Sequence, residues 1–239
     1  MTNMGLDIIS VAFNKPLLIT RQIELVREKV LDAHRLIVVD NSSSPDLAKQ
    51  VRNACGREKV EYIRSPANFG RLSFSHGGCL NWAWTNVINP SQSQYFGFLD
   101  HDIFPFRKTT LIDKINRGGG MYGLVQSRPP IWYLWPGFCF FDKAIVEGLR
   151  GEQPLNFMPK ADVFDTGGYN WEPLYSKAKM DDVKCSFGGY VKLADGNEMT
   201  SEKIGGDWLH MLNGSEWKPS PGKMELFFKY LFGLETASG

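Results

Sequence analysis

Short apolar runs alternate with segments of helical spacing along the first half of the chain. Four runs rich in branched or aromatic residues predict strands over residues 7–13, 36–39, 60–63 and 95–99. Between them, apolar residues three and four positions apart predict helices over residues 15–31, 47–55 and 74–88. Such alternation predicts parallel strands joined by right-handed crossovers. We therefore expect an α/β fold of Rossmann-like type, with a mostly parallel central sheet flanked by helices.

The pattern changes after residue 117. A run of three glycines at residues 118–120 ends a helix, strands are predicted over residues 121–126 and 138–141, and a short helix over residues 142–149. An aromatic run at residues 131–135 lies between these two strands. From residue 151 onward the chain reads as irregular. We expect a loop-rich extension packed on the same sheet, so that residues 1–239 form a single domain.

Charge and cysteine content exclude several classes of protein. A net charge of +1 gives no electrostatic basis for nucleic acid or an anionic membrane as the main partner. The four cysteines are scattered without a Cys-x-x-Cys pair, which favours buried thiols over a zinc knuckle or a dense disulfide framework. Residues 1–7 lack the features of a signal peptide, and no apolar stretch is long enough to span a bilayer. We expect a cytoplasmic protein.

Two carboxylates, Asp100 and Asp102, follow directly on the predicted strand 95–99. Ligands of open α/β sheets bind at the carboxyl ends of the strands. Carboxylates this close repel each other unless a cation or hydrogen-bond donors compensate their charge. Hard cations such as Mg²⁺ and Mn²⁺ prefer oxygen ligands and often share them with substrate phosphates. The pair predicts a metal that bridges the protein and a diphosphate, although Asp-x-Asp also occurs in turns and helix caps.

Other polar residues follow the first two predicted strands. Phe13 and Asn14 end the first strand, and Asp40 ends the second. Asp40 could contact a nucleobase or ribose, or it could cap the helix that follows Pro45. Asn14 could line the same pocket, or it could only form a turn before Lys15.

Two arginines, Arg64 and Arg71, are candidate phosphate or nucleobase contacts because a guanidinium group matches phosphate in a bidentate way. The alternative for each is a solvated side chain. No Gly-x-Gly-x-x-Gly follows the first strand, so the common dinucleotide-binding fingerprint is absent.

Four segments in order resemble the GT-A glycosyltransferases of family 2. They are residues 38–43, 68–70, 76–83 and 98–102. The resemblance covers roughly residues 7–107. It implies a GT-A fold in which residues 1–107 form the nucleotide-sugar-binding half. Residues 108–239 would then hold the acceptor-binding half and a C-terminal extension.

The resemblance also implies roles for individual residues. The donor nucleotide sugar would be bound by Phe13, Asn14, Asp40, Asn68, Arg71 and Asp100. Mn²⁺ or Mg²⁺ would be held by Asp100, Asp102 and His210, with Asp102 as the direct ligand and Asp100 reaching the ribose or metal-bound water. Many GT-A enzymes use a late histidine in this way, and the competing view of His210 is a packed or exposed side chain. His76 is interpreted as an ordinary helix histidine.

Asp165 is the candidate catalytic base, because an acidic residue at about this place serves as base in the family. Its rivals are Asp162 and Glu172, and the usual Glu-Asp pair of the family is missing. As an alternative, Asp165 would be a helix N-cap. The aromatic residues Trp132, Tyr133 and Trp135 could stack on sugar faces or fill a hydrophobic lid.

The function that follows from the resemblance is metal-dependent transfer of a sugar, with inversion, from a nucleoside-diphosphate sugar to a saccharide or lipid-linked acceptor. Two other classes stay open: a sugar-phosphate nucleotidyltransferase and a non-catalytic carbohydrate-binding module. The aromatic-rich segment 224–232 is predicted to be a helix. It would pack on the core or make a peripheral membrane contact.

Overall fold

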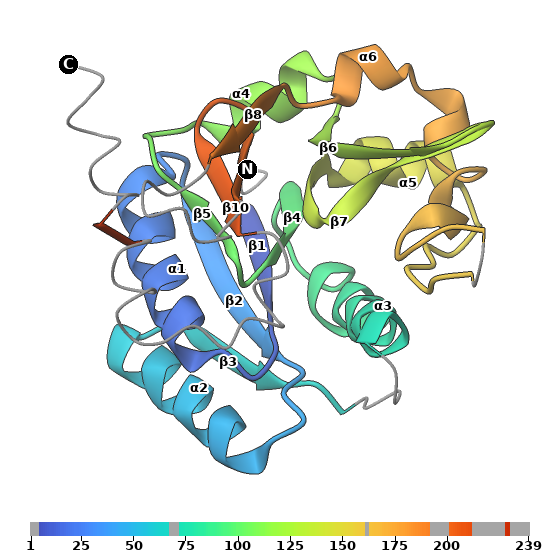
Figure 1. The fold of residues 1–239 in the computed structure, drawn as a ribbon. Helices are drawn as coiled ribbons and strands as arrows, with labels where there is room; N and C mark the ends of the chain where they lie inside the picture. Colours follow the sequence, from blue (N-terminus) through green and yellow to red (C-terminus); the bar gives the residue numbers. More distant parts are fainter. Residues whose placement is uncertain (1–4, 67–71, 161–162, 192–200, 212–227, 230–239) are drawn as a thin grey trace.

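The computed structural model describes residues 5–66, 72–160, 163–191, 201–211 and 228–229 (Figure 1). All structural statements below concern these residues. Asn68, Arg71 and Asp162 lie outside them, as does most of the predicted C-terminal helix. Of that helix, Phe228 is buried, and its ring packs edge-on against Phe104 at 5.6 Å between centroids.

A central sheet runs through the molecule in the strand order β3-β2-β1-β4-β7-β6. Its strands are β1 (Leu6–Ala12), β2 (His34–Asp40), β3 (Glu61–Arg64), β4 (Tyr95–Asp100), β6 (Met121–Arg128) and β7 (Ile131–Asp142). The first four strands are parallel, while β7 runs antiparallel to β4 and pairs with β6 as a hairpin. The predicted mostly parallel sheet is confirmed.

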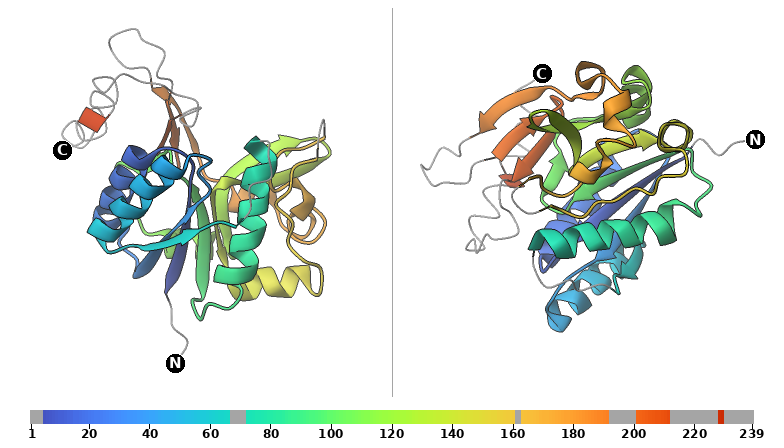
Figure 2. Two further views of the ribbon diagram at one scale, coloured as in Figure 1. Left: turned by 90° about the horizontal axis from the view of Figure 1, so that it is seen from below. Right: turned by 90° about the vertical axis from the view of Figure 1, so that its right-hand side faces the viewer.

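Helices cover both faces of this sheet. They are α1 (Pro16–Lys29), α2 (Pro45–Glu58), α3 (Leu72–Ala83), α4 (Leu111–Arg117), α5 (Lys143–Arg150) and α6 (Met180–Val183), with short turns η1 (Trp84–Ile88), η2 (Gly168–Asn170) and η3 (Tyr175–Lys177). Figure 2 shows α1 and α2 on one face and α3 and α5 on the other. None of the described helices is both long enough and apolar enough to cross a membrane.

The apolar residues of β1 alternate between two cores, one on each face of the sheet. Ile9 and Val11 face α3, whereas Ile8 and Ala12 face α1. This is the period of two expected of a strand buried on both faces. Local signals agree with the helices: Ser44 caps α2, because its hydroxyl accepts a hydrogen bond from the backbone N–H of Leu47.

A second, antiparallel sheet is the main difference from the sequence prediction. It has the order β5-β10-β9-β8, with β5 (Ile103–Pro105), β8 (Phe187–Val191), β9 (Ser201–Ile204) and β10 (Trp208–Met211). The expectation of an irregular extension packed on a single sheet is therefore wrong. These strands are short, and β10 pairs with β5 from far back in the chain, a pairing that no local pattern signals.

The aromatic run at residues 131–135 is part of a strand and not a loop before one. It begins β7, which runs unbroken through Pro136 and Gly137 to Asp142. The break in hydrophobic period around these two residues explains why the sequence predicted only residues 138–141 as strand. The paired strand β6 has a register shift between Gly123 and Val125.

Asp7 is a buried carboxylate near the start of β1. It therefore lies at the amino ends of the parallel strands, opposite the end that carries the acidic pair. It accepts hydrogen bonds from Arg35, from the Ser91 hydroxyl at 2.5 Å and from the Ser93 hydroxyl at 2.9 Å. Burial alone would raise the pKa of Asp7, but these hydrogen bonds and the positive charge of Arg35 bring the pKa below its ordinary value. A carboxylate with a lowered pKa stabilises the fold above its unfolded-state pKa, and that contribution is lost as the pH falls through the folded-state value.

Asp7→Asn is expected to lower the free energy of unfolding by about 1–3 kcal/mol at pH 7, because it removes charge-assisted hydrogen bonds in the interior. Urea denaturation followed by circular dichroism at pH 7 and at about pH 3 measures the difference. The difference should shrink in acid. Glu61→Gln is the control, since Glu61 is an exposed partner of the same arginine. An equal loss at both pH values would contradict the role of the Asp7 charge.

Candidate active site

The turn between β4 and β5 carries the acidic pair. Asp100 is the last residue of β4, and its side chain is 21% exposed; Asp102 precedes β5, and its side chain is 7% exposed. His101 lies between them and points elsewhere: its Nδ1 donates to the carbonyl oxygen of Val11 at 3.1 Å. The backbone N–H of Met211 donates to the Asp102 carbonyl at 2.9 Å, which ties β10 to the turn.

Gln22, a fully buried side chain of α1, holds both ends of this turn. Its Nε2 donates to the carbonyl oxygens of Asp100 at 2.7 Å and Ile103 at 2.8 Å. The hydroxyl of Ser10, on β1, donates to Gln22 Oε1, while the two carbonyl oxygens, which only accept, fix the amide NH₂ group toward the turn. Gln22 was not predicted, because one glutamine on the apolar side of a helix gives no sequence signal of what it contacts.

Asp100 faces a histidine of α3. His76 Nε2 lies 3.0 Å from Asp100 Oδ1, so His76 is more than the ordinary helix histidine that the sequence suggested. Burial alone would raise the pKa of Asp100, but His76 and, less strongly, His101 and His210 lower it. Burial would lower the pKa of His76, and the carboxylates of Asp100, Asp165 and Asp102 raise it instead. When His76 is protonated, the two groups form an ion pair inside the site.

Asp102 faces the other predicted histidine. His210 Nε2, on β10, lies 3.9 Å from Asp102 Oδ1, and Asp102 Oδ1 is buried without a hydrogen-bond partner in the described chain. His210 Nδ1 lies 2.7 Å from Glu202 Oε1, and because a carboxylate only accepts, Nδ1 carries the proton. The ring of Trp135 packs on His210 at 4.9 Å between centroids. In the neutral ring, the Nε2 lone pair is then left free on the side of Asp102.

These residues fit a divalent cation in two respects. An unpartnered buried carboxylate oxygen lies beside an imidazole nitrogen, and a second carboxylate, Glu202, orients that imidazole from behind, as in many carboxylate–histidine–metal sites. Burial would lower the pKa of His210, but Glu202, Asp102 and Asp100 raise it. Within the described residues, no group of three or more His, Cys, Asp or Glu side chains could hold a metal ion as they stand. Asp102 and His210 are the pair to which further ligands would add.

Asp40 is fully buried, and its carboxylate is engaged by its own protein. Oδ1 accepts from the backbone N–H of Ser42 at 2.9 Å, and Oδ2 accepts from the Tyr62 hydroxyl at 2.8 Å and lies 3.2 Å from Arg64. Arg64 also donates to the carbonyl oxygens of Asp40 and Ser42, so it is not merely solvated. Asp40 does not cap α2, because Ser44 does. A contact with nucleoside stays a prediction.

Asn14 joins the ends of β1 and β2. Its backbone φ of +53° makes the turn that the sequence allowed, and its side-chain amide donates to the Ser43 hydroxyl at 2.8 Å. Its Oδ1 accepts from the backbone N–H of Ser44 at 3.1 Å. Phe13, beside it, is half-buried. The structure thus gathers Phe13 and Asn14 next to the loop after Asp40, as expected, but it assigns them no ligand.

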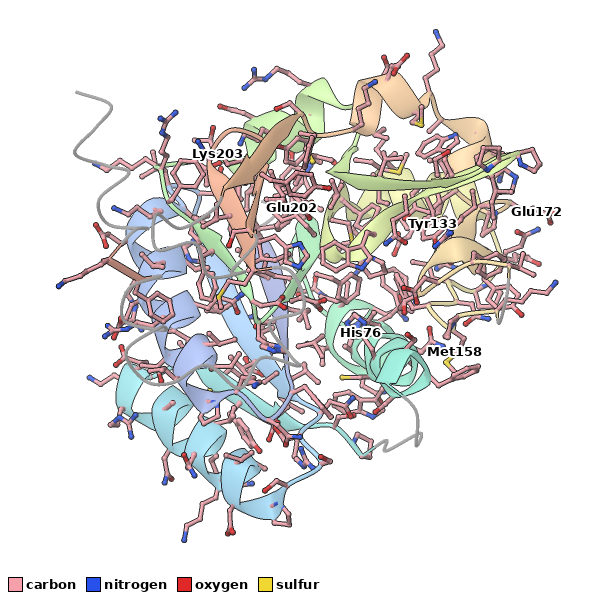
Figure 3. All side chains as sticks on the ribbon, in the orientation of Figure 1. His76, Tyr133, Met158, Glu172, Glu202 and Lys203 are labelled. Atoms are coloured by element: carbon pink, nitrogen blue, oxygen red, sulfur yellow. The ribbon has the colours of Figure 1, made fainter. Side chains whose placement is uncertain are left out.

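Asp165 lies on a loop that the structure brings to the same site. It is close enough to His76 to raise the pKa of that histidine. Its backbone N–H donates to the hydroxyl of Tyr133 at 3.0 Å, and its Oδ1 accepts from the backbone N–H of Thr166 at 2.7 Å. It does not cap the following turn η2, whose N-cap is Gly167. The rival Glu172 is exposed and lies at the outer edge of the molecule, away from His76 (Figure 3).

Two amide side chains hold this loop, Asn81 from α3 and Asn170 from η2. Asn81 Oδ1 accepts from the backbone N–H of Phe157 at 2.7 Å, and Asn170 Oδ1 accepts from that of Asn156 at 2.8 Å. Gly77 makes room for the loop, since a Cβ atom there would lie 2.5 Å from the Phe157 carbonyl oxygen. The loop carrying Asp165 is therefore fixed against the helix carrying His76.

The three aromatic residues proposed for the acceptor have different surroundings. Tyr133 is fully buried and so cannot stack on a sugar. Trp132 packs against Trp171 at 5.8 Å and Tyr175 at 5.4 Å between ring centroids. Trp135 packs on His210, as described above. Of the two predicted roles, stacking on a sugar and filling a hydrophobic lid, only the second fits Tyr133.

The fold and the first half of the site define a class of protein. Residues 7–120 match the family model described as glycosyl transferase family 2. The match covers just under half of the chain and agrees with the mostly parallel, helix-flanked sheet, which confirms the resemblance seen in the sequence. No curated protein matches the chain.

Among solved structures, similarity is low in sequence. A mannosyltransferase from Pyrobaculum calidifontis, PcManGT, in complex with GDP-Man and Mn²⁺ is 14% identical with a TM-score of 0.42, covering 60% of this chain and 46% of that one. S. aureus TarS 1-349 with UDP-GlcNAc is 15% identical with a TM-score of 0.44, covering 64% and 48%. Glucosyl-3-phosphoglycerate synthase from Mycobacterium tuberculosis is 15% identical with a TM-score of 0.46, covering 76% and 69%. The chain thus spans less than half the length of the first two.

Gln22→Met is expected to lower the free energy of unfolding by about 1–3 kcal/mol, because two buried carbonyl oxygens lose their donor. If Gln22 positions the acidic turn, the folded variant should also bind Mn²⁺ more weakly than the wild type, measured by calorimetry well below the melting temperature. Gln50→Met, an exposed change on α2, is the control. Unchanged Mn²⁺ affinity in Gln22→Met would show that the turn keeps its shape without Gln22.

Proposed function

We propose that the protein is a metal-dependent glycosyltransferase that moves a sugar from a nucleoside-diphosphate sugar to a saccharide or lipid-linked acceptor with inversion. One observation carries the proposal: Asp102, in the region that matches family 2, faces His210 of β10, which Glu202 of β9 orients. Asp100 and its partner His76 lie beside them.

In this proposal Asp102 and His210 hold Mn²⁺ or Mg²⁺. When bound, the cation supplies Lewis-acid stabilisation of the charge that develops on the leaving diphosphate. Glu202 keeps the proton of His210 on Nδ1. Asp100, kept ionised by His76, is available to the ribose hydroxyls or to water. The loops around Asn14, Asp40, Asn68 and Arg71 bind the nucleoside and phosphates of the donor.

Asp165 is the base in this proposal. The acceptor O–H attacks the anomeric carbon, a new C–O bond forms as the bond to the diphosphate oxygen breaks, and the acceptor proton passes to the Asp165 carboxylate. Attack from the face opposite the leaving group inverts the anomeric configuration. The fixed loop and its proximity to His76 support Asp165 over Glu172.

Nucleotide sugars with Mn²⁺ test the donor side directly. A panel that includes GDP-mannose and UDP-N-acetylglucosamine should give a thermal shift and slow release of nucleoside diphosphate for at least one member. A shift with a nucleoside triphosphate but with no nucleotide sugar would favour the nucleotidyltransferase. A shift with free saccharides alone would favour a non-catalytic carbohydrate-binding module.

Glu202→Ala is expected to weaken Mn²⁺ binding by about 10–100-fold, because His210 loses the carboxylate that orients it. Glu202→Gln should lie between this variant and the wild type, since its amide oxygen still accepts from His210 Nδ1. Calorimetric titration with Mn²⁺ in the presence of nucleoside diphosphate measures the effect. Glu152→Ala, an exposed change elsewhere, should bind as the wild type does. Equal Mn²⁺ affinity in Glu202→Ala and Glu152→Ala would contradict the assignment of His210 as a ligand.

Asp165→Asn is expected to abolish turnover and to leave donor binding intact, because the amide cannot take the acceptor proton. Single-turnover transfer and donor affinity are measured side by side on the same preparation. Glu172→Gln separates the rival assignment, and Asp181→Asn, an exposed carboxylate on α6, serves as the neutral control. Retained donor binding together with retained turnover in Asp165→Asn would rule out Asp165 as the base.

A further inference from the structure

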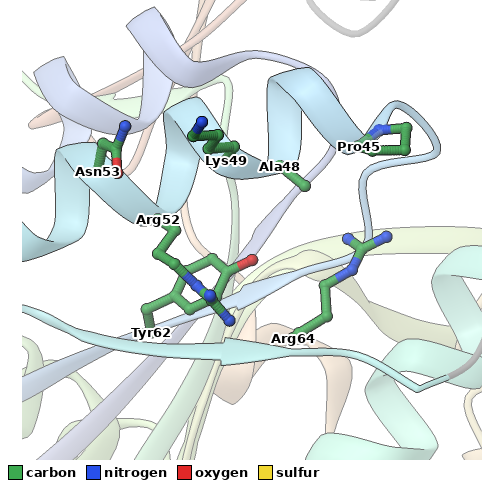
Figure 4. A pocket seen from close by; sticks show the side chains of 7 residues that line it. All are labelled: Pro45, Ala48, Lys49, Arg52, Asn53, Tyr62 and Arg64. Atoms are coloured by element: carbon green, nitrogen blue, oxygen red, sulfur yellow. The ribbon is translucent and has the colours of Figure 1, made fainter.

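A groove lies between α2 and the edge strand β3 (Figure 4). Its volume is about 680 Å³, within the range of small-molecule sites. Its lining residues are Pro45, Ala48, Lys49, Arg52, Asn53, Tyr62 and Arg64. None of them was assigned to the metal or to catalysis, although Tyr62 and Arg64 contact Asp40.

The groove is positively charged. Its lining includes three cations and no carboxylate. Lys49 and Arg52 are exposed and stand one helical turn apart on α2. Within the described chain, the Lys49 side chain has no hydrogen bond or ion pair, and the Arg52 guanidinium contacts only the Tyr62 ring, 5.1 Å from its centroid. The third cation, Arg64, forms an ion pair with the buried Asp40.

The arginines of a neighbouring groove can be compared with the cations of the α2–β3 groove. That groove, of about 490 Å³, is lined by Arg27 and Arg35 among others. Arg27 pairs with Glu58 at 2.9 Å, and Arg35 pairs with Asp7 at 2.9 Å and with Glu61 at 3.3 Å. Its two arginines are therefore matched by carboxylates, whereas Lys59, which also lines it, has no described ion pair. The two adjacent cations of the α2–β3 groove have no such match, which leaves a place for an external anion.

We propose that the α2–β3 groove binds the phosphate group of a phosphorylated small molecule. Arg52 offers a planar pair of donors that suits phosphate, and Lys49 adds a mobile point charge next to it. The Asn53 amide is a neutral donor on the same helix. Pro45, Ala48 and the Tyr62 ring line the rest of the groove and provide apolar contact for the organic part.

The groove shares a wall with the loop predicted to bind the donor nucleoside. Tyr62 and Arg64 line the groove and also contact the carboxylate of Asp40. An occupant of the groove would thus touch the two side chains that hold this loop. The acidic pair Asp100 and Asp102 does not line the groove, so binding there does not depend on the proposed transfer reaction.

Calorimetric titration of the full chain with inorganic pyrophosphate tests the proposal, without divalent metal and at constant ionic strength. Pyrophosphate offers adjacent phosphate groups to the adjacent cations. The wild type should bind one equivalent. Lys49→Ala with Arg52→Ala should weaken binding by about tenfold or more, the loss expected for charge-assisted hydrogen bonds.

The matched control is Arg57→Ala with Lys108→Ala, which removes the same charge from exposed positions outside the groove and should bind as the wild type does. Lys49→Glu is a second groove variant that disturbs no described side-chain contact, and it should also lose binding. No binding to the wild type, or equal binding in Lys49→Glu and the wild type, would overturn the proposal. Equal binding would place the anion elsewhere, such as the donor site.

Discussion

The charge of two neighbouring carboxylates is the constraint around which this molecule is arranged. Asp100 and Asp102 come one residue apart at the end of a buried strand, where each would repel the other. Two histidines from distant parts of the chain lie next to these carboxylates. His76 reaches Asp100 from α3, and His210 approaches Asp102 from β10. The acidic turn therefore faces a helix on one side and a second sheet on the other.

The second sheet brings one of these two histidines to the acidic turn. β10 pairs with β5 directly after the acidic turn, and His210 stands opposite Ile103 in that pairing. The adjacent strand β9 supplies Glu202, which stands opposite His210 in the register of the two strands. Trp208, a core residue of β10, packs on Phe138 of the central sheet at 5.2 Å between ring centroids. The small sheet thus fixes one histidine and its carboxylate partner against the rigid large sheet.

The periodic pattern of the sequence predicted the strands and helices, but it did not predict contacts between side chains that are far apart in the chain. The parallel strands and their helices followed from local period, since β1, β2 and β4 are buried runs with helices between them. The proximity of His210 to Asp102 followed only from a family resemblance. The roles of Gln22 and Glu202 could not be predicted, because each depends on a hydrogen bond to a residue elsewhere in the chain. Asp40 illustrates the converse: its place at a strand end was clear, but its engagement by Tyr62 and Arg64 was not.

The elements that carry Asp100 and Asp165 differ in kind, and this explains why Asp165 was the hardest site residue to place from the sequence. The acidic turn follows a buried strand whose pattern is visible in the sequence, and the Gln22 side-chain amide and the Met211 N–H donate to its carbonyl oxygens. Asp165 lies on a loop whose position depends on side-chain amides and on the Tyr133 hydroxyl. Single side chains of this kind leave no period in a sequence. The acidic turn thus follows a regular element, whereas Asp165 lies on an anchored loop, and loops vary more in sequence and shape than the elements they connect.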